Sequence, residues 1–216
     1  MPRQTNEVAA NTKTRPDFIA ASIEVSPGQV LKGEVEAGLF PPNTRTYLHD
    51  LGRHTHQELA RAARMIRDAG YSPVQHIAAR RLTGTQALAS HIKRLVNEGG
   101  LDDVLVIAGE SERQMGPYSS TMDVLRSQIL DRHGIRHIGV AGHPEGNPAA
   151  PRGTEQASLQ EKAAFQRESD AALRMVTQFV FEGTGFAHWA IGLREAGIDL
   201  PVHIGVAGPA SMATLL

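Results

Sequence analysis

The sequence predicts an α/β fold of the (β/α)8 type, the TIM barrel, on three observations. Short apolar runs alternate along the chain with longer amphipathic stretches, which is typical of parallel strands covered by helices. The first run continues as IEVSPGQ, which is not the GxGxxG turn of a dinucleotide-binding sheet. Polar residues follow several of the runs, and barrels assemble their active sites from the carboxyl ends of many strands.

Seven apolar runs are predicted as strands. They are short, often β-branched and continuous, as expected of parallel strands buried on both faces. The hexapeptide HIGVAG occurs in both the fifth and the seventh run. Both are odd-numbered strands, which contribute side chains to the same layers of a barrel interior. The predicted strands cover residues 18–25, 45–50, 73–79, 103–109, 136–142, 175–181 and 201–208.

Five amphipathic stretches between these runs are predicted as helices. The first places Leu59, Ala63 and Ile66 on one face and ends at Gly70. The third begins with serine caps and ends at Gly134. The predicted helices cover residues 56–70, 83–100, 119–134, 158–174 and 186–197.

Seven strands leave the predicted barrel one strand short. The 216 residues are also fewer than the roughly 250 of a typical barrel. We therefore expect a flexible polar arm at residues 1–17 and one barrel domain at 18–216 that is incomplete at its C-terminal side. The first and seventh strands would then have unpaired edges. Either the rest of the barrel lies outside this chain, or a partner, such as another copy in a homo-oligomer, covers the gap.

Composition narrows the function classes. The net charge of −1 carries no electrostatic signature of nucleic-acid binding, and no apolar run reaches the length of a membrane span. The absence of cysteine excludes disulfides, thiolate metal sites and a cysteine nucleophile. The polar N-terminus lacks the apolar region of a secretory signal. We therefore expect a cytoplasmic protein that acts on a small molecule, without nucleic-acid or membrane partners.

Three polar side chains at predicted strand ends are candidates for chemistry. Glu24 lies between Ile23 and Val25, where it either pairs with a basic side chain or acts as an acid–base group with a pKa raised by its apolar surroundings. Glu110 follows a glycine that can turn its side chain into the barrel mouth. Gln178 stands among apolar residues, so its amide needs partners, which are either neighbouring strands or a polar heterocyclic ligand.

Ten histidines raise the alternative of a metal-dependent barrel hydrolase. The pair His54 and His56 has the spacing of metal ligands but lies at the start of a predicted helix. Only His49, His76 and His143 follow or end strands, so a metal site would need these three to converge. We predict no metal.

Four segments resemble the methylenetetrahydrofolate reductase family, and in particular its short bacterial paralogues. In chain order they are SIEVSP, VLVIAGE, VAGHPEGNP and VTQFVF, and the resemblance runs from about residue 18 to the end. The resemblance implies a (β/α)8 flavoprotein that acts on CH–NH bonds with NAD(P)H and FAD. Such an enzyme interconverts 5,10-methylenetetrahydrofolate and 5-methyltetrahydrofolate by hydride transfer. Its partners would be tetrahydrofolate derivatives.

The resemblance also implies roles for individual residues. Glu24 takes the place of the general acid that opens the methylene bridge. Glu110 stands where the family has an aspartate near flavin and pterin, and Gln178 matches a glutamine that contacts folate. The LHDLG segment replaces the family's Thr-Tyr-Gly, and a non-catalytic folate- or flavin-binding barrel remains a further alternative. The residues carried over to FAD binding are His76, Tyr118, Ser119, His143 and Lys162.

Overall fold

The computed structural model describes residues 21–109, 113–146 and 154–208. Seven parallel strands form one sheet in their order along the chain, so each strand pairs with the next. The strands are β1 (Ile23–Val25), β2 (Arg45–Leu48), β3 (Ser72–Ala78), β4 (Asp103–Ile107), β5 (His137–Gly142), β6 (Ala172–Phe179) and β7 (Val202–Gly205).

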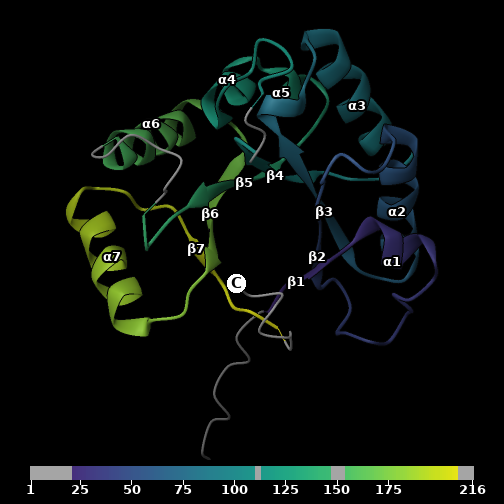
Figure 1. The fold of residues 1–216 in the computed structure, drawn as a ribbon, viewed down its shortest axis with the longest axis horizontal. Coiled ribbons are helices and arrows are strands. Elements are labelled where there is room, and N and C mark those ends of the chain that lie inside the picture. The colour runs from purple at the N-terminus through teal and green to yellow at the C-terminus, as the bar shows by residue number, and fades with distance from the viewer. Residues whose placement is uncertain (1–20, 110–112, 147–153, 209–216) are drawn as a thin grey trace, which may run out of the picture.

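Helices connect the strands and lie along one side of the sheet. Figure 1 shows the sheet curling, with the helices on its outer side. They are α1 (Pro27–Leu31), α2 (His56–Asp68), the 3-10 turn η1 (Ala79–Arg81), α3 (Thr85–Asn97), α4 (Thr121–Arg126), α5 (Ile129–Arg132), α6 (Glu155–Glu168) and α7 (Gly183–Glu195).

The α/β class and the seven parallel strands are confirmed, and the curl has the form of part of a TIM barrel. Strands β1 and β7 stand at its two ends (Figure 1). Among the described residues each of these two strands has only one neighbour in the sheet. The predicted arm at residues 1–17 and the first residues of the predicted first strand lie outside the described part.

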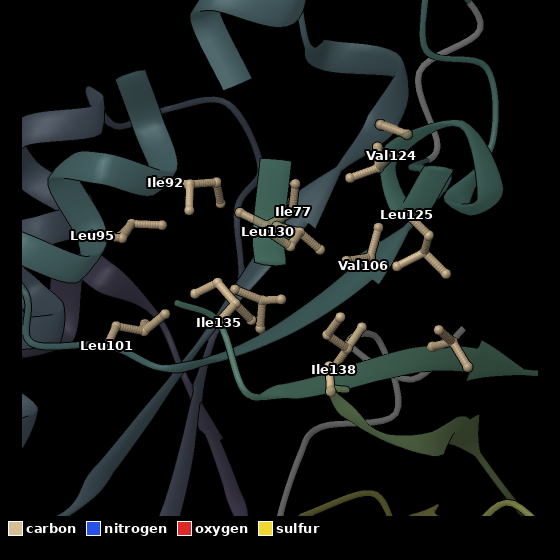
Figure 2. Close-up of a cluster of buried hydrophobic side chains, with 14 of the residues drawn as sticks. Ile77, Ile92, Leu95, Leu101, Val106, Val124, Leu125, Leu130, Ile135 and Ile138 are labelled. Atoms are coloured by element: carbon tan, nitrogen blue, oxygen red, sulfur yellow. The ribbon is translucent and has the colours of Figure 1, made fainter. Parts of the chain in front are cut away.

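The main core fills the space between the sheet and the helices. Figure 2 shows part of it, where strand side chains such as Ile77 and Val106 meet residues of α3, α4 and α5. At about 25 cal/mol per Å² of buried apolar surface, such contacts are the principal source of stability. The labelled members are Ile77, Ile92, Leu95, Leu101, Val106, Val124, Leu125, Leu130, Ile135 and Ile138.

Two of the predicted helices are wrong in extent. The segment 119–134 forms two short helices, because Gln128 adopts a left-handed backbone with φ of 57° between α4 and α5. The segment 158–174 ends as a helix at Glu168. Residues 172–174 already belong to β6, and the Gln166 side chain holds this turn by bonding the backbone of Ala171 and Leu173.

Helix α1 was not predicted and has a clear local cause. The Ser26 hydroxyl accepts a hydrogen bond from the Gln29 amide, and the Gln29 side chain accepts one from the Ser26 amide. Pro27 occupies the first turn, where its missing N–H is not needed. Within the described residues, no helix is both long and apolar enough to cross a membrane.

Candidate functional site

The inner face of the curled sheet is defined by a small second cluster. Tyr47, Val74 and Leu105 pack together, apart from the core beneath the helices. Since side chains alternate along a strand, His49 and His76 lie on the same side as Tyr47 and Val74. The edge of the His76 ring faces Tyr47, with ring centroids 6.0 Å apart. The inner face therefore carries polar groups from neighbouring strands.

Glu24 and His49 meet near the carboxyl ends of β1 and β2. The His49 Nδ1 atom lies 3.3 Å from Glu24 Oε1, and the side chains are 28% and 54% exposed. This is the end of the sheet where barrel enzymes hold their active sites. Glu24 is thus paired within the protein, but with an imidazole and not with a lysine or arginine.

The prediction that burial raises the pKa of Glu24 is wrong. The hydrogen bond with His49 is the largest influence and lowers this pKa, against the opposite effect of burial; His76 and the charge of His49 lower it further. Glu24 is half-exposed, so desolvation is too weak to reverse the effect of its neighbours. The carboxyl group is therefore ionised at neutral pH.

His76 completes the group from β3. It is 9% exposed, and its Nε2 atom has no hydrogen-bond partner among the described residues. Burial lowers the pKa of this imidazole, so it is neutral at physiological pH. A buried polar atom without a partner costs about 1–3 kcal/mol, and such an atom calls for an explanation, such as a bound water or ligand.

A second polar group lies on the same inner face, nearer the amino ends of the strands. Arg174 Nη2 lies 2.9 Å from Asp103 Oδ1, and Arg45 Nε lies 3.3 Å from Asp103 Oδ2. Arg174 also donates a hydrogen bond to the Tyr47 hydroxyl at 3.1 Å. The side chains of Arg174 and Asp103 are each 6% exposed. These contacts join β2, β4 and β6. Asp103 Oδ1 and Arg174 Nη2 meet as an ion pair, and neither atom has a hydrogen-bond partner among the described residues.

An open hollow of about 330 Å³ adjoins the segment after β2. Asp50, His54, His56 and Arg81 contribute to its lining. The His56 ring stacks on that of buried His91, with centroids 3.9 Å apart. In the described part of the chain, no three histidines, aspartates or glutamates gather so as to hold a metal ion.

Gln178 differs from its prediction. Its side chain is exposed near the carboxyl end of β6 and not enclosed among apolar residues. The backbone carbonyl of Gln178, by contrast, accepts a hydrogen bond from the Thr177 hydroxyl at 2.8 Å. Because the Gln178 side chain is exposed, water can satisfy its amide group, and neighbouring strands need not. His143 follows β5 and is half-buried, and burial together with the Lys162 charge lowers its pKa.

Three residues carried over to FAD binding already have partners within the chain. The buried Tyr118 hydroxyl donates to Thr85 Oγ1 at 3.2 Å, and the Ser119 hydroxyl donates to Asp123 Oδ2 at 2.7 Å. Lys162 Nζ donates to the Ala141 carbonyl at 2.9 Å, and burial lowers the pKa of this amine. Their polar atoms thus stabilise the protein itself. Glu110, the remaining candidate, lies outside the described residues.

Comparison with known proteins identifies no family, because the chain matches no family model. The chain aligns with the crystal structure of a 3-dehydroquinate dehydratase from Geobacillus kaustophilus at 14% identity. The alignment covers 88% of this chain and 84% of that one, with a TM-score of 0.37. So low a score adds no argument about fold or function.

The sequence did not single out the pairing of His49 with Glu24. His49 was considered only as a metal ligand, although the alternation Arg45, Tyr47, His49 in RTYLHD places all three on one face. The Asp103–Arg174 pair was missed because Arg174 was assigned to the end of a helix. A strand beginning at Ala172 would have shown it on the inner face.

Proposed function

We propose that this chain is a flavin-dependent oxidoreductase that interconverts 5,10-methylenetetrahydrofolate and 5-methyltetrahydrofolate, with NAD(P)H as electron donor or acceptor. The observation that carries the proposal is the group of Glu24, His49 and His76 at the carboxyl ends of three adjacent strands. Ring opening of a methylene bridge requires proton transfer, and this group combines a carboxylate with two imidazoles. We also propose that the open curl belongs to a (β/α)8 barrel.

Of the residues carried over to FAD binding, His76 is the one that fits a direct contact with the cofactor. The buried Nε2 atom of His76 lacks a partner among the described residues, and a polar ring that reached it would supply one, which suits the role that the resemblance assigns to His76. The polar atoms of Tyr118, Ser119 and Lys162 are bonded within the chain, so their role is confined to shaping the surroundings of the site. Bound FAD would supply the hydride chemistry, which side chains cannot provide.

The chain's own residues have three tasks in this proposal. The Glu24–His49 pair holds and transfers the proton that the leaving nitrogen needs. Exposed Gln178, near the carboxyl end of β6, has an amide that can both donate to and accept from a pterin. Neutral His76 orients the flavin ring from the floor of the site.

The proposal is tested with the purified full chain and added FAD. We expect a visible flavin spectrum that stays with the protein on gel filtration and is bleached anaerobically by 5-methyltetrahydrofolate. Glu24→Gln should lower the rate of bleaching about 10²–10⁴-fold, the usual contribution of a positioned acid–base group. Glu34→Gln, at an exposed glutamate, is the matched control. Protein that retains no FAD and does not oxidise the folate would refute the proposal; tight binding without turnover would favour a non-catalytic binding barrel.

A further inference from the structure

The contact between Glu24 and His49 involves one particular nitrogen of the imidazole ring. It is the Nδ1 atom of His49 that lies 3.3 Å from the Glu24 carboxylate. The Nε2 atom stands on the other side of the imidazole ring, away from that contact. When a carboxylate accepts the Nδ1–H of a histidine, it fixes the tautomer and leaves Nε2 to exchange protons.

The charged groups around His49 favour Glu24 as its anionic partner. On β3, His76 is buried and carries no charge at neutral pH. On its own segment, the Asp50 carboxylate accepts the Gly52 amide at 2.8 Å and lies 4.0 Å from Arg81 Nη1. Arg81, in η1, also donates a hydrogen bond to the backbone carbonyl of Asp50 at 2.9 Å. These contacts hold Asp50 toward η1. On β1, Glu24 is the carboxylate that faces His49.

We infer that His49 is the proton donor of this site and that Glu24 is its positioning residue. The inference rests on the proposed function and changes the role that the resemblance gives to Glu24. The Glu24 carboxylate faces Nδ1 of His49, so Nε2 is the ring nitrogen left to exchange a proton with a ligand. His49 is also 28% exposed, so solvent can return the proton after each turnover.

The step balances without any further reagent. The bond between the bridging carbon and N10 of the folate breaks, and its electron pair passes to N10. The proton on Nε2 of the His49 imidazolium moves to N10, and the bridging carbon becomes an iminium on N5. The positive charge thus passes from His49 to the substrate, and Glu24 keeps its hydrogen bond to Nδ1–H. In the opposite direction, neutral His49 accepts the proton from N10.

Two variants of His49 separate donation from positioning. In His49→Asn the amide keeps a donor toward Glu24 but cannot release a proton; in His49→Phe both functions are lost while the ring is kept. We expect both variants to slow the turnover of 5,10-methylenetetrahydrofolate about 10²–10⁴-fold, measured per bound FAD. If His49→Asn keeps the wild-type rate, His49 only positions Glu24 and the inference is wrong.

The pair can also be tested without turnover. NMR titration of the Glu24 carboxyl should show a higher pKa in His49→Phe than in wild type, because the hydrogen bond that lowers it is gone. An unchanged Glu24 pKa would overturn the pairing, even in an active enzyme. Wild type that binds no FAD and converts no folate would instead overturn the proposed function, and the donor role with it, while a shifted Glu24 pKa would still establish the pair.

Discussion

The inner face of the sheet carries two polar groups that differ in burial and in the kind of partner that their carboxylates have. Near the amino ends of the strands, Asp103 and Arg174 are each 6% exposed and are paired at 2.9 Å. Near the carboxyl ends, Glu24 is 54% exposed, and its ion-pair partner within the described segments is an imidazole at 3.3 Å. Both groups place a carboxylate inside a curled sheet, yet their surroundings differ in solvent access and in the number of partners.

This difference separates a structural role from a functional one. The Asp103 carboxylate is buried and faces two guanidinium groups, so it is shielded from ligands and from solvent protons. A half-exposed carboxylate beside histidines can change its protonation and can be reached by a ligand. Charged residues on an inner strand face therefore do not by themselves indicate a site; those that solvent and ligands can reach do.

The largest expected effect comes from removing the carboxylate of the buried group, Asp103, and is compared with removal of the exposed carboxylate, Glu24. Asp103→Ala should lower the free energy of unfolding by about 3–5 kcal/mol, because it leaves the buried Arg174 charge without its partner. Glu24→Ala should change it by less than about 1 kcal/mol, since exposed pairs contribute little. Urea unfolding of both variants at pH 7 measures the two values.

A double variant tests whether the unpaired, buried Arg174 charge causes the loss of stability in Asp103→Ala. Asp103→Leu combined with Arg174→Met replaces the pair by apolar side chains and should recover most of the lost stability. If Asp103→Ala is no more destabilising than Glu24→Ala, the two groups are not different in kind and the comparison fails.

The repeated hexapeptide HIGVAG shows how far the sequence predicts the fold. Sequence pattern located both copies in strands, and the structure places them in β5 and at β7. In β5, Ile138 and Val140 are 1% and 0% exposed; in the second copy, Ile204 and Val206 are 48% and 73% exposed. Identical residues differ because Ile138 and Val140 belong to the core between the sheet and the helices, whereas β7 stands at the end of the described sheet with one neighbouring strand. That is a property of topology and not of local sequence.

The candidate site was predictable only in part for a similar reason. Pattern and resemblance both led to Glu24 and His76, because each is a polar residue in an apolar run. The pairing of Glu24 with His49 depends on register, with Glu24 level with Tyr47 across the β1–β2 ladder. Register between strands that are separated by a helix and a loop is not encoded in either strand alone. The direction of the Glu24 pKa shift could therefore not be derived before the contact was known.

A smaller effect is expected from replacing His76. His76→Leu keeps a similar volume and removes a buried Nε2 atom that has no partner, so it should raise the free energy of unfolding by about 1–2 kcal/mol. Under the proposed function it should also weaken FAD retention, because the proposal assigns that atom to the flavin. Stability gained while function is lost is typical of residues kept for a ligand.

His91→Leu is the matched control for His76→Leu. His91 is also buried, at 2% exposure, and its Nδ1 atom also lacks a partner among the described residues, but it lies between α2 and α3 and not on the inner face. It should not change FAD retention, measured as bound flavin per chain after gel filtration. Equal loss of FAD in both variants would place the flavin away from His76.

The smallest expected effect is the pH dependence that Glu24 contributes to stability. Its pKa in the folded protein lies below the ordinary value of 4.5, so the unfolded chain binds the proton first as the pH falls. The stabilisation by the His49 contact is therefore complete above pH 4.5 and is lost as the pH falls from 4.5 through the lowered pKa. Because Glu24 is half-exposed, we expect no more than about 1 kcal/mol.

Urea unfolding should give a stability difference between wild type and Glu24→Gln that is constant above pH 5 and shrinks below pH 4.5. A difference that grows on acidification would mean that the folded protein favours the protonated carboxyl, and the contrast with the buried network would then rest on exposure alone.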